Sequence, residues 1–369
     1  ETVKIDDTVN TNNIKVNIMN SGNISSSGTV NYTGNGIFSY SASGSNTLGD
    51  ITNYGAINGS GDGYSTGNGI IFIFDLGSST MGDITNYGII SGSGDGDYTG
   101  NGISSFSGSS NTLGDITNYG TISGSGGGRG NFTGNGISCA SSSSFSEPVT
   151  IGAITNYGII SGSENGTGAG NGIISSSNNS GITIGAVTNY GTISGNGSGS
   201  RGHVGNGIYS FSQNSTSMIG AITNYGTISG NGVGREFSGN GIISSSMAAA
   251  SMIGAITNYG IISGSGEGSE FSRNGISSYS DDLVSTIGNI INYGIISGRG
   301  NGSGNRIGNG IIFSSKGSSS AIGDIANYGT ISGSGTGDTV GNGISSYSNS
   351  RTATITSISN TGVIMGSQN

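Results

Sequence analysis

Apolar residues occupy fixed places in a phrase that recurs along the chain. In one copy, Leu48 is followed by Ile51 three positions later and by Ile57 after a further six, and Ile70 closes the tetrapeptide G-N-G-I. The same four apolar positions return in later copies. No stretch follows the i, i+3, i+4, i+7 spacing of an amphipathic helix, and glycine is too frequent to permit one. Short β-branched runs bounded by Gly and Asn instead predict strands.

Each copy carries one tyrosine that marks it, and the steps between successive marker tyrosines run from 32 to 38 residues. Degenerate copies with Ser21 and Thr361 at the marker position flank this set, so residues 1–369 hold about eleven units of ~34 residues and form one domain. Each unit offers about three short strands, around D-I-T, around T-I-S and along G-I-S-S-Y. One unit cannot bury its apolar side chains alone, so we expect the units to stack.

This pattern predicts an all-β protein that is a single parallel β-helix, or β-solenoid. If each unit is one coil, every residue lies about 4.8 Å above its counterpart, and eleven coils give a rod roughly 50 Å long. Two coils of about 17 residues per unit are the alternative, but only one coil per unit stacks like residues on like. The Gly after each marker Tyr is expected to take a backbone angle that a Cβ would oppose.

Stacking would align asparagines at the corners and tyrosines along one flank as structural ladders. The asparagine ladder comprises Asn53, Asn86, Asn118, Asn156, Asn189, Asn224, Asn258, Asn292 and Asn327. The tyrosine ladder comprises Tyr54, Tyr87, Tyr119, Tyr157, Tyr190, Tyr225, Tyr259, Tyr293 and Tyr328. A slip of register would bring unlike residues together, which is a physical reason for the repetition.

Composition narrows the class of partner. Only 8% of the residues are charged and the formal net charge is −9, which argues against nucleic acid because phosphate binding needs a clustered basic face. The few cationic residues, such as Arg129, Arg201 and Arg235, stand singly and are interpreted as solvated. No apolar run approaches the roughly 18 residues of a membrane-spanning segment. The first residue is Glu1, so we expect a processed product whose signal peptide has been removed.

The repeated phrases resemble those of a known class of exported proteins. ITNYGTISG at 116–124 and 222–230, VTNYGTISG at 187–195 and ITNYGIISG at 84–92, each followed by G-N-G-I, resemble repeats of secreted bacterial β-helix proteins. The likeness is nearest to passenger regions of autotransporter-type adhesins. This resemblance implies a parallel β-helix that is exported and displayed on a bacterial surface.

The acidic residues offer the main candidate for chemistry. Asp50, Asp83 and Asp115 share one repeat position and would form a column, which is either a row of metal sites or an exposed column whose repulsion salt screens. The second interpretation is favoured, because a calcium cage needs six or more converging oxygens. The loops at 61–63 and 94–97 read G-D-G but lack the nine-residue rhythm of the calcium-binding β-roll. We therefore predict no cofactor, with calcium as the alternative.

The remaining reactive residues do not assemble into an active site on sequence grounds. His203 is the sole histidine and has no evident Asp or Ser partner, and Cys139 is interpreted as a small buried residue rather than a nucleophile. Arg235 with Glu236, and Glu270 with Arg273, are predicted to be exposed loop ion pairs of little worth. The Thr of I-T-N forms a single column, which weakens the case for an ice-binding array. We predict that the protein is not an enzyme.

The ends of the repeat array suggest how such a chain would act. Neither end offers a helix, a proline or a charge cluster to blunt the open edge of the solenoid. The leading hypothesis is an extracellular structural protein whose partner is itself, joined head to tail into a surface filament. The alternative is an adhesin passenger that binds surface glycans or a host surface through the Tyr flank or the loops. A carbohydrate-active enzyme and an ice-binding protein rank below these two.

Overall fold

The computed structural model describes most of the chain. The described residues are 3–6, 16–41, 46–74, 79–107, 110–128, 132–141, 148–166, 169–199, 203–269, 271–301, 306–317, 319–336, 340–348 and 352–368. Arg129, Arg201 and Glu270, considered above, lie outside them.

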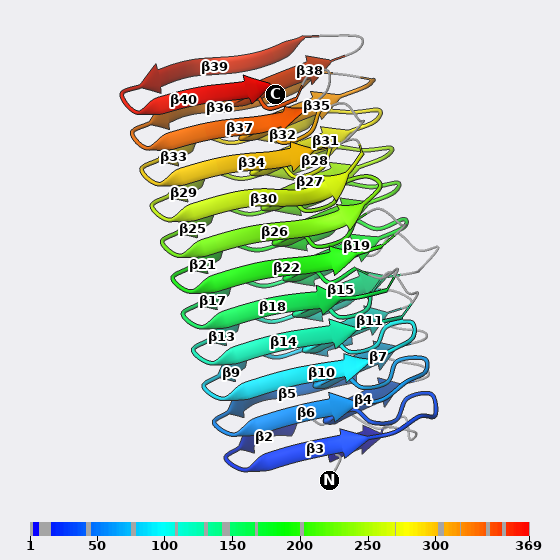
Figure 1. Cartoon of the computed structure of the whole chain (residues 1–369). Helices are drawn as coiled ribbons and strands as arrows, with labels where there is room; N and C mark the ends of the chain where they lie inside the picture. Colours follow the sequence, from blue (N-terminus) through cyan, green and yellow to red (C-terminus); the bar gives the residue numbers. More distant parts are fainter. Residues whose placement is uncertain are drawn as a thin grey trace.

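The chain winds into a prism of stacked coils whose strands form three parallel sheets. The first coil lies at one end of the rod and the last coil at the other (Figure 1). One copy of the phrase makes one coil of ~34 residues with three strands, which confirms the predicted parallel β-solenoid. About nine regular turns carry the marker tyrosine, and one divergent coil flanks them at each end. The count of about nine regular turns is slightly below the predicted number of about eleven coils, which included the degenerate copies at both ends.

Two of the sheets hold eleven strands each. Sheet A consists of β1 (Val3–Asp6), β4 (Ile37–Ser41), β7 (Ile70–Phe74), β11 (Ile103–Ser107), β15 (Ile137–Ser141), β19 (Ile173–Ser177), β23 (Ile208–Ser212), β27 (Ile242–Ser246), β31 (Ile276–Ser280), β35 (Ile311–Ser315) and β38 (Ile344–Ser348). Sheet C consists of β3 (Asn23–Ser27), β6 (Ala56–Ser60), β10 (Ile89–Gly94), β14 (Thr121–Gly126), β18 (Ile159–Glu164), β22 (Thr192–Ser198), β26 (Thr227–Gly234), β30 (Ile261–Gly268), β34 (Ile295–Asn301), β37 (Thr330–Thr336) and β40 (Val363–Gln368).

Sheet B is interrupted in most coils by a two-residue bend. It consists of β2 (Val16–Asn20), β5 (Asn46–Asn53), β8 (Ser79–Met81), β9 (Ile84–Asn86), β12 (Asn111–Leu113), β13 (Ile116–Asn118), β16 (Val149–Ile151), β17 (Ile154–Asn156), β20 (Ile182–Ile184), β21 (Val187–Asn189), β24 (Ser217–Ile219), β25 (Ile222–Asn224), β28 (Ser251–Ile253), β29 (Ile256–Asn258), β32 (Ser285–Ile287), β33 (Ile290–Asn292), β36 (Ser320–Asn327) and β39 (Ala353–Asn360). The bend is Gly-Asp, Gly-Ala or Gly-Asn, and both halves keep register with the next coil.

Register superposes like residues along the core isoleucine columns and the asparagine columns. Ile116 pairs with Ile84 on one side and with Ile154 on the other, and Asn118 pairs with Asn86 and Asn156 in the same ladder. Like residues therefore stack one coil apart, and the alternative of two coils per unit is wrong.

The core lies inside the prism and is built from the four predicted apolar columns. Ile84, Ile90, Ile103 and Leu113 are fully buried, as are their counterparts in the neighbouring coils. Strands of sheets B and C alternate buried and accessible positions, as expected for a sheet with one face in water. Several strands of sheet A, such as β27 and β31, are instead buried at all five positions.

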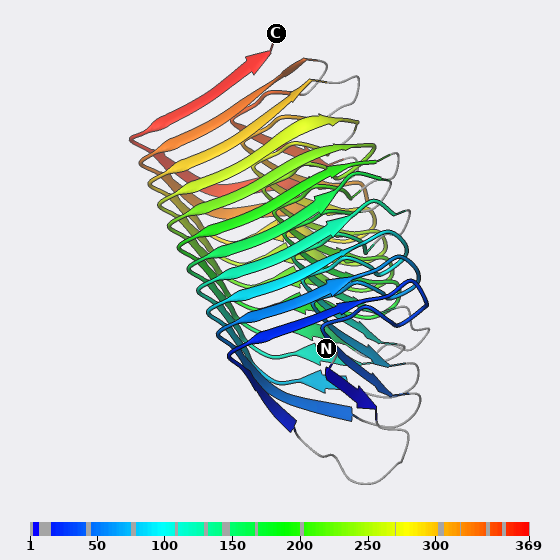
Figure 2. The same cartoon turned by 60° about the horizontal axis from the view of Figure 1, so that its bottom comes forward.

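The loops between sheets C and A, which lie along one edge of the stack (Figure 2), explain that difference, because their aromatic side chains pack on residues of sheet A. Phe237 and Phe271 of these loops pack against Tyr209, Ile243 and Tyr279 of sheet A in a second apolar cluster outside the prism. No helix long and apolar enough to cross a membrane occurs in the described residues.

The glycine that follows each marker tyrosine is required for a reason other than the predicted one. Neither Gly88 nor Gly120 has a positive φ; instead, a Cβ on Gly88 would lie 1.9 Å from the carbonyl oxygen of Gly55 in the coil before. Backbones of successive coils approach too closely there for any side chain. The positive φ falls on the first Gly of G-N-G-I, for example 63° at Gly67 and 66° at Gly239.

Candidate functional site

The asparagines of the I-T-N corner form a continuous hydrogen-bonded ladder inside the rod. Asn224 is fully buried; its Nδ2 donates to Asn258 Oδ1 at 2.8 Å and also approaches the carbonyl oxygens of Gly226 and Ile261 at 3.1 and 3.0 Å. Its own Oδ1 accepts from Asn189 at 2.8 Å. The same pattern runs from Asn20 to Asn360. Each amide thus closes the corner of its own coil and ties it to the next.

A second asparagine ladder, in G-N-G-I, was not singled out from the sequence. Both the backbone N–H and the Nδ2 of Asn240 donate to Asn206 Oδ1 in the coil before, at 2.9 and 3.1 Å. Its members are Asn35, Asn68, Asn101, Asn135, Asn171, Asn206, Asn240, Asn274, Asn309 and Asn342. The side-chain bonds point toward the first coil here and toward the last coil at the I-T-N corner. The invariant Asn of G-N-G-I was the signal that could have revealed it.

The marker tyrosines stack as parallel rings on the outside of the same corner. Ring centroids of Tyr157 and Tyr190 are 4.8 Å apart with an interplanar angle of 1°, and the stack runs from Tyr54 to Tyr328 at 4.8–4.9 Å. The side chains are about half exposed. Each ring face is covered by its neighbours, so the edges and hydroxyls reach solvent. An aromatic platform for stacking a sugar or a base is absent along this flank of the described coils.

The aspartate column lies at the bend of sheet B and hydrogen-bonds to backbone. Asp83 N–H donates to Asp50 Oδ1 at 3.1 Å, Asp115 N–H to Asp83 Oδ1 at 2.9 Å, and Ala153 N–H to Asp115 Oδ1 at 2.7 Å. The carboxylate therefore supplies an acceptor where the sheet is interrupted. A Cβ on Gly82 would lie 2.3 Å from Asp50 Oδ1, which accounts for the Gly before the Asp. Among the described residues, no three His, Cys, Asp or Glu side chains are grouped to hold a metal ion.

His203 belongs to the aromatic cover of sheet A. Its ring stacks on Tyr209 and Phe237 with centroids 5.2 and 5.4 Å away, and its Nδ1 lies 2.6 Å from the Tyr209 hydroxyl. Burial lowers the pKa of His203 to about 4 and raises that of Tyr209. The imidazole is thus neutral at pH 7, and its tautomer decides which of the two groups donates in the hydrogen bond with the Tyr209 hydroxyl.

Cys139 lies inside the prism. It is fully buried in the core cluster, and burial raises the pKa of its thiol to about 12. A protonated, inaccessible thiol packs as a small apolar residue.

Arg273 departs from its prediction as an exposed ion-pair partner. It is buried and takes the place of the first Gly of G-N-G-I with φ of 62°, and its Nη2 donates to the carbonyl oxygen of Gly268. Burial lowers the pKa of the guanidinium to about 10, while Glu267 acts in the opposite direction. The order of residues in the sequence did not reveal either the left-handed backbone or the burial of Arg273. Arg235 and Glu236 are exposed.

The outer face of sheet B carries a second threonine column besides the Thr of I-T-N. Thr47, Thr80, Thr112, Thr150 and Thr183 lie on that face, and Met218 and Met252 continue their column. The Thr of I-T-N itself stacks as the single predicted column. The ice-binding hypothesis itself stays untested.

Comparison with known proteins adds no relative. No family model, no curated protein and no solved structure matches this chain. The assignment of the fold is therefore supported by the strand register and the core packing of this chain alone.

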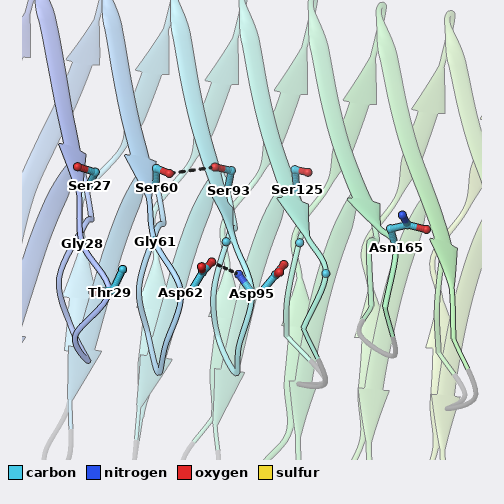
Figure 3. A pocket seen from close by; sticks show the side chains of 13 residues that line it. Ser27, Gly28, Thr29, Ser60, Gly61, Asp62, Ser93, Asp95, Ser125 and Asn165 are labelled. Atoms are coloured by element: carbon cyan, nitrogen blue, oxygen red, sulfur yellow. Dashed lines mark hydrogen bonds between the residues drawn. The ribbon is translucent and has the colours of Figure 1, made fainter.

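An axial groove lies at the carboxyl ends of the first strands of sheet C (Figure 3). It has a volume of about 840 Å³ and crosses five successive coils. Its lining residues are Ser27, Gly28, Thr29, Ser60, Gly61, Asp62, Ser93, Gly94, Asp95, Ser125, Gly126, Gly127 and Asn165. The serines form one row and the third residues of each coil another, with the glycines between them.

Proposed function

We propose that the protein is a non-enzymatic structural rod whose copies stack head to tail into an extracellular filament. The observation that carries this proposal is the state of the last coil. Ile358 is 49% exposed, whereas its counterpart Ile325 one coil earlier is 1% exposed. A core position therefore faces solvent at the end of the prism, where a further coil would bury it.

The two ends of the described chain complement each other column by column. Ile358 and Ile364 continue the columns that begin with Ile18 and Ile24. Ile18, Ile24 and Ile364 are partly buried, and Ile358 is exposed. A neighbouring copy stacked on the last coil would place its Ile18 over Ile358. The two apolar surfaces would leave water together.

The corner asparagine ladder gives this contact a direction. Asn360 Nδ2 turns back to the carbonyl oxygen of Gly362 at 3.2 Å, whereas in earlier coils the amide also reaches the next Oδ1. Asn20 Oδ1, at the other end, accepts only from the nearby Gly22 N–H among the described residues. Asn360 of one copy can therefore donate to Asn20 of the next. Edges β38 to β40 would pair with β1 to β3, a contact that does not close and so propagates.

The positions of the remaining reactive side chains favour a structural role over a catalytic one. The aspartates of the sheet B column are bound to backbone N–H groups, His203 and Cys139 are covered, and like residues stack along the described rod. The extracellular placement rests on the resemblance of the repeats to secreted β-helix proteins.

Sedimentation velocity and negative-stain imaging of the purified chain test the proposal. We expect threads much longer than roughly 50 Å at micromolar concentration. Ile358→Lys places a charge in the end contact and should leave short particles. The matched control is Ile159→Lys, because Ile159 is 46% exposed on the flank of sheet C and lies outside the end contact.

A mixing experiment separates a blocked end from a damaged fold. Ile358→Lys keeps its first coil, so a small fraction of it added to wild-type chain should cap growing threads and shorten them. A misfolded variant would leave wild-type length unchanged. Monodisperse wild-type monomers at micromolar concentration would overturn the proposal, as would equal shortening by Ile159→Lys.

A further inference from the structure

The axial groove follows from a three-residue pattern at the ends of successive sheet C strands. The pattern is an exposed Ser, a half-buried Gly and an exposed third residue, as in Ser60-Gly61-Asp62 and Ser93-Gly94-Asp95. Because the strands are in register, the pattern becomes three parallel rows along the rod axis. The Gly row has no side chains, so it forms the floor between two polar walls (Figure 3).

Two positions of the floor, Gly61 and Gly94, must be glycine. A Cβ on Gly61 would lie 1.9 Å from the carbonyl oxygen of Gly28, and one on Gly94 would lie 1.9 Å from that of Gly61. Backbones of successive coils are in contact at these two positions, so no side chain can fill the groove from below there. The groove is thus fixed by the stacking itself rather than by mobile side chains.

The groove ends where the pattern changes. In β18 the floor position is Glu164, which is buried, and its Oε2 lies 2.5 Å from where a Cβ on Gly126 would be. Asn165 lines the groove at this end. The open length spans five coils, or about 20 Å, and its serine row runs nearly straight across the coils (Figure 3).

The walls select for a neutral, hydroxyl-rich ligand. Serine hydroxyls both donate and accept, and Asp62 and Asp95 accept, so the walls can bond an array of alcohol groups. Asp62 Oδ1 already accepts the Asp95 N–H at 3.1 Å, which holds that carboxylate against the wall. Both aspartates are exposed and would repel a polyanion. The described lining holds no aromatic or cationic side chain, which disfavours an apolar or phosphorylated ligand.

We propose that the axial groove binds a straight, uncharged polysaccharide chain lying along the rod axis. Successive coils repeat every 4.8 Å or so, close to the advance of one sugar ring along an extended β-linked glycan, so the serine row offers a hydroxyl to each successive ring in four coils, and Asp62 and Asp95 add acceptors in two of them. The hydrogen bonds are solvent-exposed and individually weak, so one oligosaccharide binds with a Kd on the order of 0.1–1 mM. The site is complete in one chain and does not depend on head-to-tail assembly.

Titration calorimetry or NMR with cellohexaose as the probe tests the site. Ser93→Trp fills the middle of the groove from its wall and should raise Kd at least about tenfold. Asn231→Trp is the matched control, because Asn231 is exposed and lies in the same row of sheet C three coils beyond the groove's last serine. This control should leave Kd unchanged.

Charge exclusion provides a second readout. The double variant Asp62→Asn and Asp95→Asn keeps an oxygen for the Asp95 N–H but removes both charges, so it should admit an oligogalacturonate that the wild-type chain rejects. Failure of cellohexaose to bind at millimolar concentration would overturn the proposal. Equal loss in Ser93→Trp and Asn231→Trp would do the same, as would binding of the acidic oligosaccharide to the wild-type chain.

Discussion

Each coil has a uniform side and a varied side. The uniform side is the Asn-Tyr-Gly corner between sheets B and C, where nine copies hold the same residues. The varied side is the loop that covers sheet A. There the position two residues before G-N-G-I has a left-handed φ, from 53° to 76°, in seven copies of the phrase. Its occupants include Tyr32, Ser65, Tyr98, His203, Phe237, Phe271 and Arg306.

The difference shows what repetition is for in this molecule. At the corner, each Asn must donate to one neighbour and accept from the other, and only an identical residue in every coil completes both bonds. On the loop side, a side chain has only to cover the outer face of sheet A. Side chains of different chemistry, most of them aromatic, occupy this position. Sequence identity is thus tied to reciprocal hydrogen bonding, and shape alone governs the cover.

Breaking one link of the corner ladder should have the largest effect. Asn224→Ala removes a buried amide and leaves Asn189 Nδ2 and the Ile261 carbonyl short of a partner. We expect a loss of about 3–4 kcal/mol in the free energy of unfolding, measured by urea denaturation. Asn196→Ala is the control, because Asn196 is exposed and accepts only a long 3.5 Å bond from Asn231. A similar loss in both variants would contradict the role assigned to the ladder.

The loop side can be probed by pH through His203. The pKa is 6.5 in the unfolded chain and about 4 in the fold, so between these values the unfolded chain binds more protons. Stability should therefore fall as pH drops from about 6.5 to 4. Part of the side chain remains accessible, so we expect about 1–2 kcal/mol rather than the full shift.

His203→Phe keeps an aromatic cover without a titrating group. The difference in unfolding free energy between wild type and this variant, followed across that pH range, isolates His203 from the carboxylates. A pH-independent difference would show that the imidazole does not titrate with folding.

The smallest expected effects concern buried serines inside the prism, where a hydroxyl either has or lacks a hydrogen-bond partner in the neighbouring coils. Ser244 belongs to a buried chain of hydroxyls and lies 2.9 Å from Ser251 Oγ and 3.3 Å from Ser217 Oγ. Ser175 occupies the same column two coils earlier. The position that is Ser217 in the next coil is Ile182 in the coil of Ser175. Ser175 Oγ therefore has no hydrogen-bond partner among the described residues.

Ser244→Ala should cost about 1 kcal/mol, whereas Ser175→Ala should stabilise by a similar amount. The shift in melting temperature of each variant relative to wild type, measured by thermal unfolding, tests this prediction. Shifts of the same sign would contradict it.

The sequence was sufficient for features that depend on one column at a time. The Ile columns, the parallel stacking of the tyrosines and one coil per phrase follow from spacing, because a strict repeat leaves a single register that superposes like residues.

Features that depend on contact between different columns were not evident. The oxygen of Asp50 replaces a missing sheet acceptor only because the strand breaks at Gly82, and the glycine floor of the groove is explained only by carbonyl groups in the adjoining coil. The burial of Arg273 required the left-handed backbone of its loop, which its position in the sequence did not disclose.

The two asparagine ladders have a consequence for the electrostatics of the rod. In the corner ladder each amide N–H points toward the last coil, and in the G-N-G-I ladder it points toward the first. The amide dipoles of one ladder are therefore opposed by those of the other, and parallel sheets add little of their own. A rod of any length built this way accumulates almost no axial dipole moment, so lengthening it creates no growing field at its tips.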